Sequence, residues 1–185
     1  IQSEKVLKFG TDSVLLASFI RLNRREKLVD LGTGTGILPV LLSGRVQAEM
    51  VGIELQPEAA ELARRNVRLN GLERVRIVQG DLKNAAELVG QADVVCCNPP
   101  YDKPLAGGMK EQPELRIARY EIACTLEDVV KSAASLLSTG GRFYMVHRAC
   151  RLAEIIFCLK THRLEPKVLR TICKHAQAEP RYILI

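Results

Sequence analysis

The feature of this sequence that most constrains its fold is an apolar segment followed by three alternating glycines. Leu28-Val29-Asp30-Leu31 is typical of a buried strand, Gly32-Thr33-Gly34-Thr35-Gly36 of a loop, and residues 37–42 of the start of a helix. Glycines let the backbone approach a ligand closely, and a helix N-terminus offers free N–H groups. This order of strand, loop and helix predicts an α/β fold with a nucleotide-cofactor site.

The spacing of the glycines differs from the dinucleotide-binding pattern G-x-G-x-x-G. The third glycine comes one residue early, and Ile37 occupies the place expected for it. Asp30, immediately before the loop, adds a negative charge that disfavours a pyrophosphate and suits an ammonium group. Both observations favour a cofactor derived from methionine, such as S-adenosylmethionine.

A second apolar segment, 49–54, ends in a carboxylate. Glu54 follows Asp30 by 24 residues, which is close to the spacing at which an acidic residue binds a ribose. A carboxylate can accept hydrogen bonds from both ribose hydroxyls. We interpret Glu54 as a ribose ligand and include its neighbour Leu55 in the predicted cofactor site.

A third segment, 75–79, alternates as a strand does, and the turn Gly80-Asp81-Leu82 follows it. The Asp81 carboxylate can accept a hydrogen bond from an adenine amino group, and the N–H of Leu82 can reach a ring nitrogen. A Gly-Asp turn alone means little. Because Asp30 and Glu54 lie at the ends of the two preceding strands, the Gly-Asp turn here indicates an adenine-binding turn.

A fourth segment, 92–97, leads into Asn98-Pro99-Pro100-Tyr101, where neither proline can donate a ladder hydrogen bond. The Asn98 side-chain oxygen and the Pro99 carbonyl can each accept one hydrogen from a planar group that bears an NH2. The Tyr101 ring can stack on that plane. The turn predicts the catalytic residues Asn98, Pro99 and Tyr101, and Asn98 is also included in the cofactor site.

Because helical segments separate these strands, the sequence predicts a parallel, doubly wound sheet with its site along one edge. A short helix is expected at 13–20, with Thr11 or Asp12 as its N-cap. A long loop to about Ala118 is interpreted as a lid over the substrate. Later elements are expected as a helix from the capping box at 125–128 to about Leu137, with Gly140-Gly141 as its terminator, a strand at 142–147, a helix at 149–160, and strands at 164–173 and from 182.

Length and composition indicate a single domain over residues 1–185. The chain is 47% apolar and 26% charged, and it is long enough to bury a core. Its apolar runs are too short to span a membrane, and no secretory signal is visible. The chain begins with Ile1 rather than Met and stops inside the apolar run 182–185, which leaves room for trimming at either end.

The cysteines indicate reduced, structural thiols of a cytosolic protein and no metal site, because none forms a C-x-x-C pair. His147, at the end of a predicted strand, is interpreted as a structural hydrogen-bonding residue rather than a catalytic one. The six cysteines are Cys96, Cys97, Cys124, Cys150, Cys158 and Cys173.

Positive charge gathers near the C-terminus. The formal net charge is +6, and residues 151–185 carry seven Lys and Arg against three Glu. A basic segment is either a solvated surface or a patch that faces phosphates, and charge alone does not separate the two.

With these motifs in this order, the chain resembles the class I S-adenosylmethionine-dependent methyltransferases. Its Asn-Pro-Pro-Tyr turn resembles that of the branch that methylates adenine N6 or the glutamine amide. Four further stretches resemble the bacterial tRNA N6-adenine methyltransferases that modify the adenine beside the anticodon of a valine tRNA. These stretches are 9–17, 119–128, 146–152 and 164–167.

The resemblance implies a seven-stranded sheet with an antiparallel last strand, S-adenosylmethionine as cofactor with S-adenosylhomocysteine as product, and tRNA as partner in the cytoplasm. It implies that the glycine loop holds the methionine part near Asp30, that Glu54 holds the ribose, and that Asn98 and Pro99 bind the target amine. The predicted cofactor residues are Thr11, Asp30, Gly32, Thr33, Gly34, Gly36, Glu54, Leu55, Asp81, Leu82 and Asn98.

Two departures and three alternatives stay open. Ala149-Cys150 stands where the family often has Pro-Glu, and Glu179-Pro180-Arg181 where Glu-Pro-Asn is usual. One alternative is methylation of a protein glutamine, although those enzymes usually carry an added N-terminal domain. Another is guanine N2 methylation of ribosomal RNA, where Phe is more usual than Tyr101. A non-catalytic RNA-binding module is the third, and the intact motifs argue against it.

Overall fold

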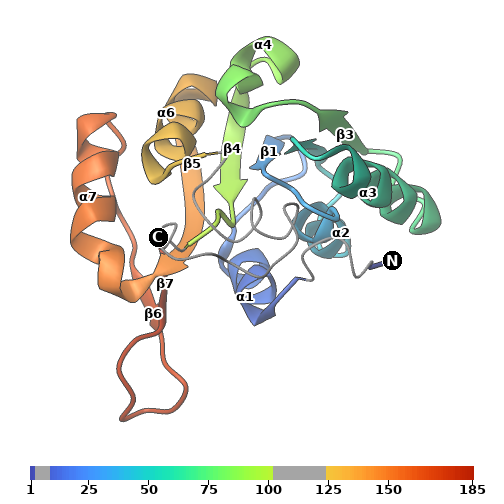
Figure 1. The fold of residues 1–185 in the computed structure, drawn as a ribbon. Helices are drawn as coiled ribbons and strands as arrows, with labels where there is room; N and C mark the ends of the chain where they lie inside the picture. The colour runs from blue at the N-terminus through green and yellow to red at the C-terminus, as the bar shows by residue number, and fades with distance from the viewer. Residues whose placement is uncertain (3–8, 102–123) are drawn as a thin grey trace, which may run out of the picture.

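The sheet has the predicted topology. The structure, a computed structural model, describes residues 1–2, 9–101 and 124–185. Its seven strands within these ranges lie in the order β3-β2-β1-β4-β5-β7-β6 (Figure 1). The parallel strands are β1 (Lys27–Leu31), β2 (Glu49–Glu54), β3 (Val75–Gln79), β4 (Ala92–Cys97) and β5 (Leu137–Arg148).

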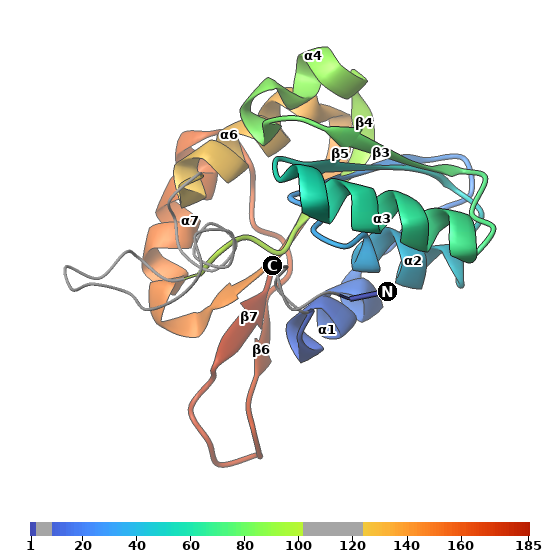
Figure 2. The same cartoon turned by 45° about the vertical axis from the view of Figure 1, so that its right-hand side comes forward.

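The last strand, β7 (Tyr182–Leu184), is antiparallel to both of its neighbours, β5 and β6 (Arg170–Ile172). The predicted α/β, Rossmann-like sheet with an antiparallel last strand is therefore confirmed. The β6–β7 hairpin extends away from the body of the molecule (Figure 2).

Helices cover both faces of the sheet, as expected for a doubly wound fold. One face packs on α1 (Thr11–Phe19), α2 (Ile37–Ser43) and α3 (Pro57–Leu69). The other face packs on α4 (Ala85–Val89), α6 (Leu126–Leu136) and α7 (Leu152–Thr161). Single turns of 3-10 helix at Leu82–Asn84 and Ala149–Arg151 lead into α4 and α7.

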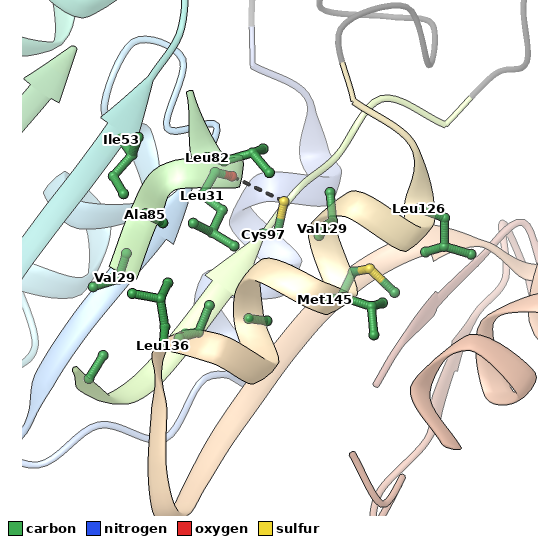
Figure 3. Packing of buried hydrophobic residues seen from close by; sticks show 14 of the residues in the cluster. Val29, Leu31, Ile53, Leu82, Ala85, Cys97, Leu126, Val129, Leu136 and Met145 are labelled. Atoms are coloured by element: carbon green, nitrogen blue, oxygen red, sulfur yellow. Dashed lines mark hydrogen bonds between the residues drawn. The ribbon is translucent and has the colours of Figure 1, made fainter. Parts of the chain in front are cut away.

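The central strands are apolar on both sides because both of their faces are covered. Alternate residues enter opposite clusters: Leu28 packs with α1 to α3, while Val29 and Leu31 pack with α4, α6 and α7. Cys96 and Cys97 divide in the same way, and both are free and buried, as predicted. Figure 3 shows the second cluster, in which the Cys97 thiol donates to the Leu31 carbonyl at 3.0 Å.

The start of β5 was wrongly predicted, because the strand begins at Leu137 rather than at Arg142. The end of α6 agrees with the predicted end near Leu137: the helix ends at Leu136, and Leu137 is already extended, with φ −70° and ψ 129°. Strand β5 then shifts its register against β4, so that Ala92 pairs with Leu137 and Val94 with Arg142. The two glycines lie inside this irregular start of the strand, where Gly140 has a φ of 80°.

Other local expectations had mixed outcomes. The capping box is confirmed, because the Thr125 hydroxyl accepts from the Asp128 N–H and the Asp128 carboxylate accepts from the Thr125 N–H. The N-cap of α1 is Gly10, not Thr11 or Asp12. The strand expected at 164–173 is extended as a strand only at Arg170–Ile172. The proposed lid lies outside the described residues.

In the described part of the chain, no helix combines the length and the apolar character needed to cross a bilayer.

Candidate active site

A cavity of about 530 Å³ lies at the carboxyl ends of β1 to β4, where open α/β sheets bind ligands. It brings together residues from the four motifs that were predicted to meet there. Of the predicted residues, those that line it are Asp30, Gly32, Thr33, Gly34, Glu54, Leu55, Asp81, Leu82, Asn98, Pro99 and Tyr101.

Two predicted cofactor residues do not line the cavity. Thr11 is exposed, and its neighbours Asp12 and Ser13 face the cavity instead. Gly36 has a φ of 79°, and a side chain there would bring its Cβ to 3.3 Å from the Cβ of Ala63 in α3. Gly36 therefore lets the loop turn into α2 against α3, which is a packing role.

The other two loop glycines also need left-handed backbone. Gly32 has a φ of 67° and Gly34 a φ of 57°, a region that L side chains rarely adopt. A Cβ at either position would meet nothing within 4 Å, so the backbone at both is open on that side. The loop can therefore present its backbone directly to a ligand.

Asp30 is a buried carboxylate at the bottom of the cavity. It is 1% exposed, and its Oδ1 accepts from the Cys96 thiol at 3.4 Å. Its Oδ2 has no hydrogen-bond partner among the described residues. Burial raises the pKa of Asp30 from 3.8 to about 7. An unpartnered buried acceptor that lines a cavity fits a cationic ligand group such as an ammonium.

Gly52 was missed in the sequence and shapes the same corner. It pairs with Asp30 across the β1–β2 ladder, and a Cβ on it would come within 2.7 Å of the Thr33 side chain. Thr33 is held there by its N–H, which donates to the Ile53 carbonyl at 2.9 Å. A glycine inside an apolar strand was the available signal for such a close approach.

Glu54 connects β2 to the glycine loop. Its Oε2 accepts from the Gly34 N–H at 2.8 Å, and its Oε1 accepts from the Gln56 N–H at 2.9 Å. Burial raises the pKa of this carboxyl, and the side chain is 7% exposed. Each carboxylate oxygen has a second lone pair, so Glu54 can also accept from two hydroxyls.

The adenine-binding turn predicted at Asp81 is held by backbone bonds. The Gly80 N–H donates to the Glu54 carbonyl at 2.9 Å, which joins this turn to β2. Asp81 caps the following 3-10 turn by accepting from the Lys83 N–H at 2.9 Å. Asp81 and Leu82 both line the cavity.

The Asn98 amide is held by two side chains. Its Nδ2 donates to the Ser13 hydroxyl at 2.9 Å, and its Oδ1 accepts from the Tyr101 hydroxyl. The same hydroxyl lies 2.6 Å from Oδ2 of Asp12. Asp12 and Ser13 were not predicted as site residues, because the contact crosses 85 residues of sequence and nothing local marks it.

The Tyr101 ring packs among protein groups. The His147 ring meets it edge-on at 5.4 Å between centroids, and the Tyr182 ring lies at 5.5 Å. The Arg148 guanidinium lies 5.6 Å from the Tyr101 centroid. His147 is fully buried, and burial lowers its pKa to about 4, so it is neutral near pH 7. It supports Tyr101 from outside the cavity lining.

The two segments that depart from the family pattern, 149–150 and 179–181, contact each other. The N–H of Ala149 donates to the carbonyl of Arg181 at 3.2 Å. The Arg181 side chain is exposed and lies over the Tyr182 ring, 5.3 Å from its centroid. A proline at position 149 would have no N–H to form this bond.

Comparison with known proteins gives a consistent family. The model of the methyltransferase small domain matches residues 2–163. A protein of Porphyromonas gingivalis named tRNA1(Val) (adenine(37)-N6)-methyltransferase is 31% identical over 99% of this chain and 75% of its own length. A protein of Yersinia enterocolitica with the same name is 33% identical over 76% of this chain and 57% of its own length.

Solved structures support the fold. An Agrobacterium tumefaciens protein described as a predicted O-methyltransferase matches with a TM-score of 0.71 and 24% identity, over 94% of this chain and 78% of its own. The geranyl diphosphate C-methyltransferase of Streptomyces coelicolor, solved with S-adenosyl-L-homocysteine, matches with a TM-score of 0.63 and 14% identity, over 87% and 62% of the two chains.

Proposed function

The chain belongs to the methyltransferase small domain family, and we propose that it transfers a methyl group from S-adenosylmethionine to the N6 amino group of an adenine in tRNA. The observation that carries this proposal is that the Asn98 turn opens into the same cavity as Asp30 and Glu54. Acceptors for an amine and acceptors for a cofactor thus face one space. We further propose that residues 1–185 form one methyltransferase domain, which the single sheet supports.

The cavity residues fit S-adenosylmethionine, which would supply an electrophilic methyl group on a positively charged sulfur. The unpartnered Oδ2 of Asp30 would accept from its ammonium group, and the Gly32 to Gly36 loop would lie against the methionine part. Glu54 would accept from the ribose hydroxyls, and Asp81 with Leu82 would bind the adenine. These groups position the cofactor, and positioning is a large part of methyl-transfer catalysis.

Asn98, Pro99 and Tyr101 would act on the target base, flipped out of its stack. An exocyclic amine is a poor nucleophile because its lone pair is delocalised into the ring. Hydrogen bonds from N6 to Asn98 Oδ1 and the Pro99 carbonyl would favour a pyramidal nitrogen whose lone pair is available. The proton can leave to water after transfer, so no strong general base is required, and the buried, neutral His147 is not needed as one.

The choice of RNA as substrate is supported by the C-terminal hairpin. It extends from the body of the molecule (Figure 2), and Tyr182, the first residue of β7, lines the cavity. Exposed basic side chains within the hairpin and in the segment before it suit a phosphate backbone, and their positive charge favours RNA over a short peptide. They are Arg163, Lys167, Arg170, Lys174 and Arg181.

The test is methyl transfer from labelled S-adenosylmethionine to unmodified bulk tRNA, followed by nucleoside mass spectrometry. We expect label in N6-methyladenosine. Label in N2-methylguanosine of ribosomal RNA, or in glutamine of a protein extract with none in tRNA, would overturn the proposed substrate. Cofactor binding without transfer to any of the three would indicate a non-catalytic module.

A further inference from the structure

Four side chains form a hydrogen-bonded cluster at the catalytic turn, and two of them come from the first turn of α1. Asn98 lies between Ser13, which is bonded to its Nδ2 at 2.9 Å, and Tyr101, which is bonded to its Oδ1. Asp12 Oδ2 lies 2.6 Å from the Tyr101 hydroxyl, and Asp12 Oδ1 accepts from the Ser13 N–H at 2.9 Å. The cluster closes on itself.

The orientation of the Asn98 amide depends on Ser13. A primary amide has one accepting end and one donating end, and only the accepting end can receive a hydrogen from the target amine. Ser13 is 4% exposed, and its hydroxyl oxygen accepts from the donating end of the amide. That contact turns Oδ1 toward Tyr101 and away from α1.

The Tyr101 hydroxyl has one proton and two acceptors. Both Asp12 Oδ2 and Asn98 Oδ1 are within hydrogen-bond distance, and neither can donate to the other. Burial, with the Asp12 carboxylate nearby, raises the pKa of Tyr101 far above its usual range, so the proton stays on the phenol. When the proton bonds Asn98, it uses one of the two lone pairs of the oxygen that the target amine needs, and that oxygen becomes a weaker acceptor for the amine.

We propose that Asp12 and Ser13 position the Asn98 amide for the reaction: Ser13 sets its orientation, and Asp12 takes over the Tyr101 hydroxyl bond so that the amide oxygen can offer both of its lone pairs to the target amine. The proposal rests on the proposed catalytic role of Asn98. Without Asp12, breaking the bond from the Tyr101 hydroxyl to Asn98 would leave a buried phenol donor without an acceptor among the described residues. Binding of the target amine would then have to offset that cost in free energy.

A double-mutant cycle between Asp12 and Tyr101 tests the proposal. We expect Asp12→Ala to lower kcat at saturating cofactor by at least about tenfold, with the dissociation constant for S-adenosylmethionine unchanged within about twofold. Asp12→Asn keeps an acceptor and should retain intermediate activity. In the Tyr101→Phe background no hydroxyl competes for Asn98, so Asp12→Ala should have little further effect. Melting temperatures establish that every variant folds.

Ser13 is tested against a matched serine of the same helix. Ser13→Ala should lower kcat several-fold, because the amide can then turn its donating end toward the substrate. Ser18→Ala is the control, since the Ser18 hydroxyl is exposed and donates to the Leu15 carbonyl of its own helix at 2.7 Å. Equal activity of the two variants would overturn the role of Ser13.

A second readout does not depend on the reaction. The Asn98 side-chain amide gives NMR signals that can be assigned by their loss in Asn98→Asp. Asp12→Ala should move these signals with Tyr101 present and much less in the Tyr101→Phe background. Equal effects of Asp12→Ala in both backgrounds, in kcat and in NMR, would overturn the role of Asp12. If the wild-type protein methylates no tRNA, the proposed substrate fails, and the NMR cycle alone decides this inference.

Discussion

Asp30 is a buried carboxyl group, and its burial disfavours the charged form. Its pKa is raised to about 7 by burial, with the Glu54 carboxylate adding to the rise, while the side chains of Thr33 and Cys96 lower it. A protonated Asp30 cannot attract an ammonium group. We therefore expect the dissociation constant for S-adenosylmethionine, measured by calorimetry, to rise about tenfold from pH 8 to pH 6. Methylthioadenosine, which lacks the amino-acid part, is the control, and an equal pH dependence for both ligands would contradict the role of Asp30.

The same residue predicts a cost in stability when no ligand is bound. Because the folded pKa lies above the unfolded value of 3.8, the folded state holds the proton more tightly, and stability from this group is lost as pH rises from about 4 through 7. Asp30→Asn removes the buried charge. It should raise the melting temperature by roughly 10 °C at pH 8 and by about a third as much at pH 5.

The control for this stability effect is Glu49→Gln, which neutralises an exposed carboxylate at the start of β2. A similar gain from Glu49→Gln at pH 8 would assign the effect to net charge instead of burial. Asp30→Asn should also abolish tight cofactor binding, so the proposed site keeps a ligand contact at the expense of stability.

At the scale of elements, the sheet was predictable because its strands are buried on both faces and its motifs sit at strand ends. Strand β4 is apolar except for Asp93, and Asn98 with two prolines follows it, so its end was visible in the sequence. The start of β5 was not visible, because Gly140-Gly141 resembles a helix terminator. Pairing with β4 overrides that local signal, and the glycines lie inside the strand.

The candidate site was predictable only where each residue follows its own strand. Asp30, Glu54, Asp81 and Asn98 could be placed together because parallel strands present their carboxyl ends at one edge. Asp12 and Ser13 reach this edge from a helix that precedes the sheet. Their helical pattern gives no hint of which turn faces Asn98, and that information exists only in the packing of α1 against α2 and β5.

The capping box of α6 gives a prediction at this scale. The helix buries Leu126, Val129, Val130, Ala133 and Leu136 against the sheet, so fraying its first turn exposes core. Thr125→Ala should lower the free energy of unfolding by about 1 kcal/mol, measured by urea denaturation. Ser135→Ala, which removes an exposed hydroxyl bonded within the same helix, should have almost no effect. Equal losses would show that the cap is not what stabilises α6.

At the scale of the whole molecule, exposed basic residues occur at both ends of the sheet. The β6–β7 hairpin lies at one end of the sheet, and α3 lies against β2 and β3 at the other (Figure 2). Both carry exposed cations. If tRNA approaches the cavity, its phosphates should contact the hairpin side and not the exposed face of α3. Tyr182 of the hairpin lines the cavity 5.5 Å from the Tyr101 ring, whereas α3 lines it only through the buried Ala59.

Matched pairs of substitutions test this arrangement. Lys167→Gln with Lys174→Gln removes two exposed cations before and within the hairpin, and Arg65→Gln with Arg68→Gln removes two from α3. Each lost phosphate contact should reduce the slope of log affinity against log salt by about 0.7 to 0.9. In tRNA-binding titrations across salt concentrations, we expect the first pair to reduce the slope by about 1.5 and the second to leave it nearly unchanged. The dissociation constant for S-adenosylmethionine should stay constant in both. Equal reductions in slope would mean that RNA responds to net charge alone, and the hairpin would lose its assigned role.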